Sequence, residues 1–412
     1  MRSSHDAASV QRFRAMGRTV ASFGTVACVA LVASSVVPTS ALGQVLRGTI
    51  VHSDSVSPAQ GVLVEARTQK SGPFRTLSDA RGAFSIPLPV EDSVSVRVLR
   101  IGFRPTESPT YFVPTRGGTP VQVVLDNTPY HMSTVSVLAE SRCGNRADAA
   151  GWLRWEQALT VFRTVDLTQR DTSVRFRAVE YEGPTSESGV TRINADSVLK
   201  LAPAVGQPPQ AHYDSLFRLG FVRQNRGDSA TTYYAPDARL FAHDRFAPGY
   251  CFRALPTSDS LPGVLGIAFE PVARRRVTDV DGRIWLDSAS LELRRIEFQY
   301  RQLPQDHNIK GPGGYVDFIR LATGHWIVNE WMIRMAQLMH PLERCNINWR
   351  GVYVAPPTEK GGCVYLVRTR FGLWGRSQIV ASVLKGGERL YFDPYAETLA
   401  QRAEAARKPL EF

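Results

Sequence analysis

Three carboxylates in the second half of the chain are of a residue type that carries out acid–base chemistry. Asp287, Glu297 and Glu330 lie in or beside segments whose residues alternate as in strands. Two carboxyl groups about 5–10 Å apart can hydrolyse a glycosidic bond, one as general acid and the other as base or nucleophile. Alternation along strands does not fix that separation, so a hydrolase that uses such carboxylates stands as the alternative function.

Two other polar motifs favour structural roles. His243 and Asp244 have the types of a base and its orienting carboxylate, but the sequence places no nucleophile beside them, which favours a surface or capping role. The run Asp279–Gly282 resembles the opening of a calcium loop but lacks the later oxygen ligands and the closing glutamate. No GxSxG elbow, P-loop or GxGxxG occurs. We therefore expect no catalytic activity, no metal and no cofactor.

Aromatic residues supply the candidate binding set. Trp285, Trp326 and Trp331 lie in one strand-rich region, and we predict that they line a ligand-binding cavity. Such a site implies no cluster of carboxylates with shifted pKa values, whereas a hydrolase implies two converging carboxylates in a cleft. A protein that only supports a neighbouring transport complex implies an exposed apolar patch instead.

The first 43 residues have the parts of a secretory signal peptide. An apolar run, Val20–Val37, follows a positive region and precedes small residues at Ala41–Gly43; the positive region holds Arg2, Arg12, Arg14 and Arg18. Gly24 and several hydroxyl residues weaken the apolar run as a membrane anchor. We expect a mature chain that begins near Gln44, exported to the periplasm or associated with the outer membrane.

The chain is basic, with 49 lysines and arginines against 38 acidic residues in 412. Removing a leader with four arginines and one aspartate lowers the net charge from +11 to +8. A basic exported protein meets anionic polysaccharide, lipid headgroups and cell wall more readily than nucleic acid. The densest basic run, Arg274–Arg276, lacks the interleaved aromatic residues of a base-stacking surface, so we expect no nucleic-acid partner.

Four cysteines remain after the leader. An even number in an exported chain favours disulfides, and four cysteines allow three pairings; they are Cys143, Cys251, Cys345 and Cys363. A bond between Cys345 and Cys363 closes a short loop between two β-like runs, which leaves Cys143 for Cys251. Zinc is the rival, but no CxxC or nearby CxxH spacing supports it.

Short β-like runs separated by turn residues fill residues 45–126, a pattern typical of a β-sandwich. At Asp79–Phe84, the aspartate can hydrogen-bond the backbone of its own turn. Gly82 can take the positive φ that closes the turn, and Phe84 then points into the core. We therefore interpret Asp79, Gly82 and Phe84 as a structural turn rather than a site.

Ordered motifs in this region resemble the carboxypeptidase regulatory-like domain. They are Gly48, Pro58–Val62, the turn at Asp79–Phe84, and Ile101–Phe103. The resemblance implies a seven-stranded prealbumin-like sandwich, grouped with carbohydrate-binding-like folds, that is the non-catalytic companion of a peptidase. No HxxE zinc pair follows it in this chain.

The rest of the chain predicts a larger antiparallel β-rich α+β domain. Residues 147–163 have the apolar stripe of a packed helix, and Tyr395–Lys408 is a second helix. From residue 173 onward apolar and polar residues alternate, with a hairpin turn at Asp287–Ser290. This region is similar to uncharacterised C-terminal regions that accompany regulatory-like domains. Its Gly-x-Ile-Trp-Leu-Asp hairpin resembles the sheets of periplasmic lipoprotein carriers.

Tyr130–Ala139 resembles the segment that precedes the plug in outer-membrane TonB-dependent receptors, although no plug follows. We predict a signal peptide at 1–43, an immunoglobulin- or prealbumin-like sandwich at 44–128, a linker at 129–148 and the β-rich domain at 149–412. The expected function is that of a non-enzymatic cell-envelope binding or scaffolding protein. Its partner would be an envelope polysaccharide, an apolar ligand in the sheet, or an outer-membrane protein.

Overall fold

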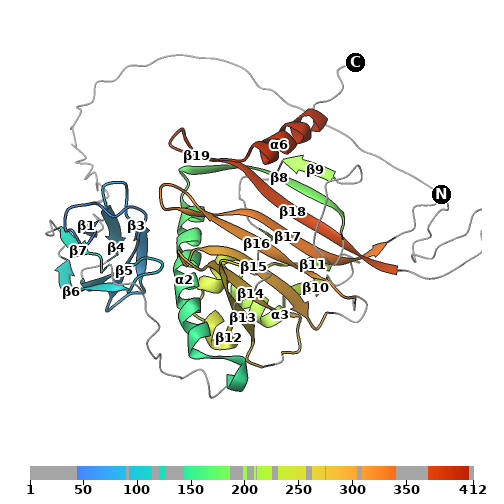
Figure 1. Ribbon diagram of the computed structural model, residues 1–412, viewed down its shortest axis with the longest axis horizontal. Coiled ribbons are helices and arrows are strands. Elements are labelled where there is room, and N and C mark those ends of the chain that lie inside the picture. The colour runs from blue at the N-terminus through green and yellow to red at the C-terminus, as the bar shows by residue number, and fades with distance from the viewer. Residues whose placement is uncertain are drawn as a thin grey trace, which may run out of the picture. The chain divides into compact units, whose positions relative to one another are not determined.

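The computed structural model describes most of the chain after the predicted leader. Its described residues are 44–89, 92–113, 120–126, 143–185, 198–201, 208–209, 211–224, 231–256, 262–273, 275–303, 309–339 and 370–407. Strands predominate, in several largely antiparallel sheets (Figure 1). The prediction of a mainly β fold is therefore confirmed. The predicted signal peptide, the segment 130–139, Cys345 and Cys363 lie outside the described residues.

The N-terminal region is a sandwich of seven strands, as predicted. One sheet has the order β4-β1-β7 and the other β3-β2-β5-β6. The strands are β1 (Gln44–Val51), β2 (Leu63–Thr68), β3 (Phe74–Leu77), β4 (Ala83–Leu88), β5 (Asp92–Leu99), β6 (Thr106–Val113) and β7 (Val121–Val124). The sequence pattern did not show β6, which contains Pro109. A proline is tolerated there because β6 is an edge strand.

The turn at Asp79 joins the two sheets of the sandwich. The Asp79 carboxylate accepts hydrogen bonds from the backbone N–H groups of Arg81 and Ala83, each at 2.8 Å. Gly82 adopts a φ of 71°, in the region that L side chains avoid. Phe84 is buried in the core between the sheets. In this geometry the three residues close a turn and anchor a strand.

A separate sheet of ten strands makes up most of the rest of the described molecule. Its order is β12-β13-β14-β15-β16-β17-β18-β8-β9, with β19 paired to β18. The strands are β8 (Val174–Pro184), β9 (Val198–Leu201), β12 (Tyr250–Leu255), β13 (Val264–Pro271), β14 (Asp279–Asp287), β15 (Leu293–Arg301), β16 (Gly313–Arg320), β17 (Trp326–Met339), β18 (Arg370–Lys385) and β19 (Glu388–Phe392). A separate hairpin pairs β10 (Val222–Gln224) with β11 (Thr231–Tyr233).

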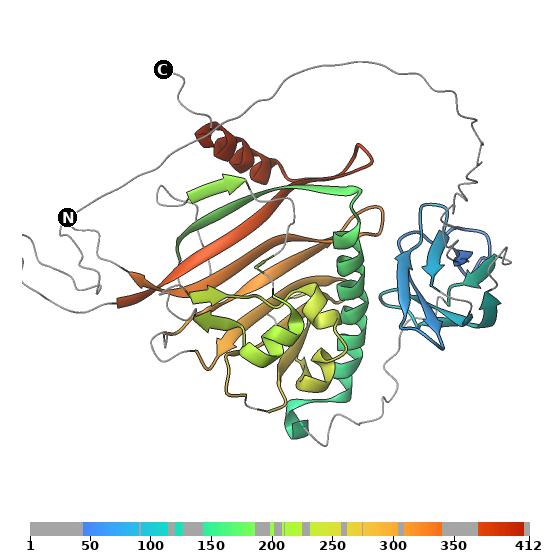
Figure 2. The same cartoon turned by 180° about the vertical axis from the view of Figure 1, so that it is seen from behind.

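Helices cover one face of this sheet, here called the covered face. The long helix α2 (Ala149–Arg170) runs along the strands' ends in both views, and three short helices lie beside it (Figures 1 and 2). These are α3 (Tyr213–Leu219), α4 (Ala238–Ala242) and α5 (Phe246–Gly249). α2 extends beyond the predicted 147–163 at its C-terminal end. It begins at Ala149, after Asp148, whose Oδ1 caps the helix by accepting from Gly151 N at 2.6 Å.

Aromatic side chains fill the space between these helices and the sheet. Trp155 of α2 stacks on Phe252 of β12, with ring centroids 4.3 Å apart, and on Phe246 of α5 at 5.5 Å. Gly151 allows this approach, because a Cβ there would lie 2.5 Å from the carbonyl oxygen of Phe252. The predicted stripe of α2 is therefore core.

The opposite face, here called the open face, is covered at one end. Helix α6 (Pro394–Arg407) packs there on β8 and β18 through Leu399 and three alanines, against Val179 and Ala381. At the other end the 3₁₀ helix η1 (Gly144–Arg146) packs against β12, and between these two ends the face carries the residues of a groove. The disulfide between Cys143 and Cys251 ties the segment before α2 to the edge strand β12 and confirms that predicted pairing.

Candidate ligand-binding site

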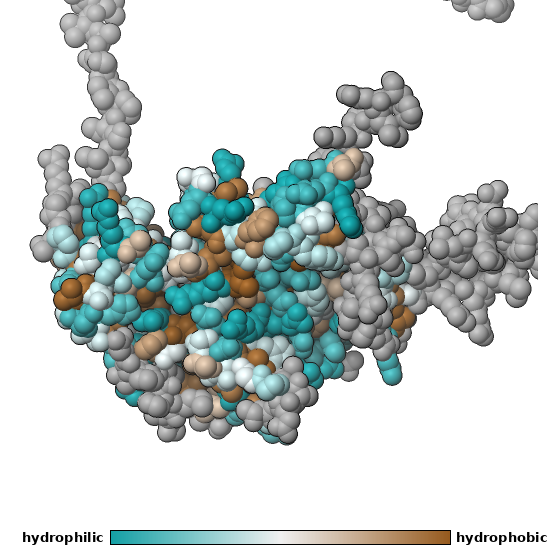
Figure 3. All heavy atoms as spheres, turned by 45° about the horizontal axis from the view of Figure 1, so that its top comes forward, coloured by the Kyte–Doolittle hydropathy of each residue, from teal (hydrophilic) through white to brown (hydrophobic). Residues whose placement is uncertain are grey.

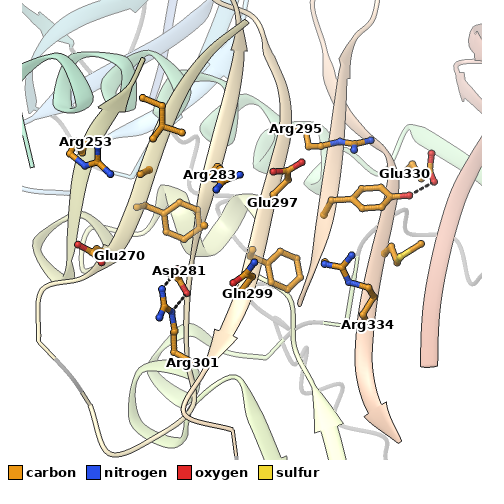
Figure 4. A pocket seen from close by; sticks show the side chains of 18 of the residues that line it. Arg253, Glu270, Asp281, Arg283, Arg295, Glu297, Gln299, Arg301, Glu330 and Arg334 are labelled. Atoms are coloured by element: carbon orange, nitrogen blue, oxygen red, sulfur yellow. Dashed lines mark hydrogen bonds and ion pairs between the residues drawn. The ribbon is translucent and has the colours of Figure 1, made fainter. Parts of the chain in front are cut away.

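A groove with a volume of about 780 Å³ lies on the open face (Figure 4). Its walls come mostly from side chains of β12 to β17, with Tyr181 of β8 at one end. Ten charged residues line it. Six are arginines, namely Arg146, Arg253, Arg283, Arg295, Arg301 and Arg334, and four are carboxylates, namely Glu270, Asp281, Glu297 and Glu330. The groove is therefore polar and carries more positive than negative side chains.

Strand register explains how residues far apart in sequence meet here. Arg253 of β12 pairs with Ala268 of β13, which pairs with Arg283 of β14, which pairs with Glu297 of β15. The same row continues to Tyr315 of β16. Because neighbouring residues of a strand point to opposite faces, these five share the open face, while the residues between them face the helices.

Three of the arginines are neutralised by carboxylates. Arg295 donates from Nε and Nη2 to the two oxygens of Asp317, each at 2.6 Å, and its guanidinium lies 4.4 Å from the ring centre of Tyr315. Arg301 pairs in the same two-pronged way with Asp281 (Figure 4). Arg146 Nε lies 3.7 Å from a carboxylate oxygen of Glu270. These pairs join neighbouring elements and fix the walls of the groove.

A second group of polar residues forms the end of the groove nearest β8. The hydroxyl of Tyr315 donates to Oε1 of Glu330 at 2.6 Å (Figure 4). Asp317 is the cross-strand partner of Glu330. Burial raises the pKa of Glu330 and, despite the Arg295 guanidinium, that of Asp317. Burial and the Glu330 charge likewise raise the pKa of Tyr315.

Arg253 and Arg283 differ from the paired arginines. Both are exposed, and within the described residues neither side chain makes a hydrogen bond or an ion pair. Figure 4 shows them on either side of the same stretch of β13. Sequence reasoning missed both. The alternation of apolar and polar residues indicated strands in this region, but only the register of β12, β13 and β14 brings the two arginines into one row.

The predicted tryptophan set is not brought together. Trp326 and Trp331 are 3% and 1% exposed and belong to the core on the covered face, where Trp331 Nε1 donates to Gln378 at 3.1 Å. Trp285 lies on the other face, beside Gly266, and is not among the residues that line the groove. The expected aromatic lining is therefore corrected: arginines and carboxylates line the groove instead.

Two of the three predicted carboxylates line the groove, on β15 and β17, with β16 between them. These are Glu297 and Glu330, whereas Asp287 closes the hairpin turn between β14 and β15 by accepting from Ser290 N at 2.9 Å. That turn and the Arg294 guanidinium lower the pKa of Asp287 to about 2. Its role is therefore structural, as a turn residue.

Of the remaining polar motifs, His243 and Asp244 lie away from the groove, whereas the run Asp279–Gly282 contributes Asp281 to its lining. His243 stacks on Tyr213, with ring centroids 3.4 Å apart. Asp279 is buried, accepts from the Tyr250 hydroxyl at 2.6 Å and pairs with Arg275. Among the residues that the structure describes, no group of three or more His, Cys, Asp or Glu side chains is placed to hold a metal ion.

In the described part of the chain no helix is both long and apolar enough to span a membrane.

Comparison with known proteins adds little to this geometry. No protein-family model matches the chain, and no curated protein matches it. Among solved structures the chain is similar to a 9R-lipoxygenase from Cyanothece PCC8801, at 13% identity and a TM-score of 0.15. That match covers 63% of this chain and 40% of the lipoxygenase, so the chain spans less than half the length of that protein. So low a TM-score carries no argument about fold or activity.

Proposed function

We propose that the chain is a cell-envelope binding protein whose groove on the open face holds a saccharide chain. The observation that carries this proposal is the groove itself: polar side chains from six neighbouring strands line it, on a face that described elements cover at its two ends. Saccharide hydroxyls both donate and accept hydrogen bonds. The arginines and carboxylates of the groove offer the matching partners.

The groove favours an extended ligand. It runs across the strands from β12 to β17, five interstrand steps of about 4.8 Å, or roughly 24 Å. Ala268, at the centre of the row, contributes only a methyl group to its floor. An oligomer can therefore lie along the row of side chains.

Of the ligands left open by the sequence, an apolar molecule fits less well. The covered face is filled by packed aromatic residues such as Phe252, Phe269 and Phe298, each at most 1% exposed. An apolar ligand in the groove would leave charged side chains without water or partners, which is costly. The polar lining therefore supports a saccharide over a lipid-like ligand.

A scaffolding role without a ligand has less support. Exposed large hydrophobic side chains lie on separate elements, for example Phe112 on β6, Leu219 on α3 and Tyr395 on α6. In the view of Figure 3, hydrophilic residues make up most of the described surface, with hydrophobic ones between them. A docking surface for a partner protein would concentrate apolar area in one place.

Location in the envelope belongs to the same proposal. It is supported by the signal-peptide pattern of residues 1–43 and by the Cys143–Cys251 disulfide, since disulfides persist in oxidising compartments outside the cytoplasm. The N-terminal sandwich resembles non-catalytic companion domains. We assign it the role of a companion module, with the groove as the binding site.

The test is a glycan panel probed with the purified mature chain and a variant whose groove is filled. In Ala268→Trp an indole replaces the methyl group on the groove floor, so binding should fall at least about tenfold. Thr172→Trp, in an exposed turn, is the matched control and should bind as wild type. Equal binding by the Ala268→Trp protein would remove the groove as the site.

A second candidate function, a hydrolase of envelope polymers, is favoured by one observation. Glu330 is a largely buried carboxyl with a raised pKa that faces the groove, beside Asp317 on the next strand. A carboxyl whose pKa is raised by burial holds its proton more tightly and can act as a general acid. If the chain cleaves a polymer that it binds, new reducing ends should appear with wild type and fall at least about a hundredfold in Glu330→Gln.

A further inference from the structure

Two arginines on the floor of the groove have no carboxylate partner among the residues that the structure describes. Arg253 on β12 and Arg283 on β14 flank Ala268 on β13 in one cross-strand row. Strands lie about 4.8 Å apart, so the two Cα atoms are separated by about 10 Å across the methyl group of Ala268. Both side chains rise from the same face of the sheet, as Figure 4 shows.

Other arginines of the same groove have their charge satisfied. Arg295 and Arg301 each make a two-pronged pair with an aspartate on the adjacent strand. Those aspartates are Asp317 and Asp281. At Arg253 and Arg283 the position between them, where an acidic residue would neutralise both, is an alanine. Two adjacent, unpaired guanidiniums are electrostatically unfavourable unless water or an anion lies between them.

Nearby carboxylates do not fill this place. Glu297 is the cross-strand partner of Arg283, on the side away from Ala268, and makes no ion pair with it among the described residues. Glu270, the next open-face position on β13, lies against Arg146. The space over Ala268 is therefore bordered by donors from both sides.

We infer that the groove recognises an anionic group of its ligand, a phosphate or a carboxylate on a saccharide, held between Arg253 and Arg283 over Ala268. A guanidinium presents N–H donors in a fixed plane that matches the oxygens of either anion. Two such groups on opposite sides can bind different oxygens of one phosphate, or both oxygens of one carboxylate. This inference rests on the proposed saccharide-binding function and names the class of saccharide.

The charge of the groove and of the whole chain also favours an acidic ligand, but it does not show where on the protein that ligand binds. Six arginines and four carboxylates line the groove, and the whole chain carries a net charge of +11. Net charge alone would attract any polyanion to any part of the surface. The test must therefore separate a site from a general electrostatic attraction.

The experiment compares three immobilised polymers and two double variants of the mature chain. Dextran is neutral, polygalacturonate carries carboxylates and phosphorylated dextran carries phosphates. Arg253→Gln/Arg283→Gln removes the two central guanidiniums. Arg47→Gln/Arg402→Gln removes two exposed arginines on β1 and α6, outside the lining of the groove, and lowers the net charge equally.

We expect wild type to bind at least one acidic polymer at least about tenfold more tightly than dextran. The central double variant should lose that preference and keep its dextran binding, while the control variant should change by less than about twofold. The acidic polymer that shows the larger loss identifies the anion as a carboxylate or a phosphate.

Two results would overturn the inference and leave the groove proposal standing. One is an unchanged preference for acidic polymers in the central double variant. The other is no preference in wild type, with dextran binding still abolished by Ala268→Trp. If Ala268→Trp binds every polymer as wild type does, the proposed function itself is wrong, whatever the arginine variants do.

Discussion

The two faces of the ten-stranded sheet are made by the same strands and differ in almost every property. On the covered face, residues such as Ile296 and Phe298 of β15 pack against helices and are at most 1% exposed. On the open face, their immediate neighbours Arg295, Glu297 and Gln299 line a groove. Because alternate residues of a strand point to opposite faces, β15 supplies side chains both to the core and to the candidate site.

This division separates stability from recognition. Burial of large aromatic side chains supplies most of the free energy that folds such a sheet, and the covered face contains nearly all of them. Charged residues that face water contribute little to folding. The open face can therefore carry unpaired arginines and buried acids, because the other face stabilises the sheet without them.

The largest expected effect is a difference in the free energy of unfolding between two variants with substitutions at adjacent positions of β15. Phe298→Ala removes a ring that is 1% exposed in the aromatic core and should lower the free energy of unfolding by about 3–5 kcal/mol. Gln299→Ala, on the exposed open face, should change it by no more than about 0.5 kcal/mol. Urea denaturation of both variants of the mature chain measures the difference.

Similar losses in the two variants would contradict the division between the faces. A large loss in Gln299→Ala would mean that the open face is packed against part of the protein and does not face solvent. Circular dichroism of both variants, recorded before denaturation, checks that each retains its β structure.

The next largest effect is the loss of stability expected when the disulfide at the edge of the open face is removed. Cys251 of β12 is fully buried among Cys143, Ala147 and Val272, beside the short 3₁₀ helix η1 (Gly144–Arg146). The bond closes a segment with a sequence separation of 108 residues, and its loss should cost about 2–4 kcal/mol. Thermal denaturation of the Cys143→Ser/Cys251→Ser variant beside wild type measures this loss of stability. A loss of less than about 1 kcal/mol would show that packing alone holds β12 at the edge of the sheet.

Sequence alternation predicted much of this architecture because it reports local geometry. It indicated the sandwich, the turn at Asp79, the helix α2 and the strands β14 and β15 within a few residues. It also indicated, through the count and spacing of cysteines, the pair Cys143–Cys251. Each of these depends on residues close in sequence or on simple elimination.

The site could not be predicted in the same way. Trp326 and Trp331 are five residues apart, which in a regular strand puts them on opposite faces. A register shift between Asp317 and Phe318 of the partner strand β16 breaks that alternation, so both tryptophans face the core. The row that joins Arg253 to Arg283 likewise depends on strand register, which one sequence pattern does not reveal.

A smaller effect tests the buried end of the groove. Burial raises the pKa of Glu330, so the folded state binds its proton more tightly than the unfolded state does. This contribution to stability is complete at low pH and is lost as pH rises from the ordinary value of 4.5 through the raised folded pKa. Glu330→Gln removes the buried charge and keeps an oxygen for Tyr315, so above that window it should be more stable than wild type, by on the order of 1 kcal/mol.

Chemical denaturation between pH 4 and pH 8 tests this sign. The stabilities of wild type and Glu330→Gln should converge at the acid end and separate as pH rises. Tyr315→Phe is the companion variant, because the Tyr315 hydroxyl lowers the pKa of Glu330 and its loss should extend the window to higher pH. A Glu330→Gln protein that is less stable than wild type at pH 8 would mean that the ionised carboxylate is favourably held.

The smallest effect belongs to an ion pair on the open face. Arg301 and Asp281 join β15 to β14, and the arginine side chain is 59% exposed. Because water solvates both charges when they are apart, Asp281→Asn should cost only about 0.2–1 kcal/mol and the cost should shrink in 1 M salt. A double-mutant cycle with Arg301→Gln isolates the pair. A coupling above about 2 kcal/mol, insensitive to salt, would show that this face is desolvated. It would then be a second packed surface, and the groove would have to be sought elsewhere.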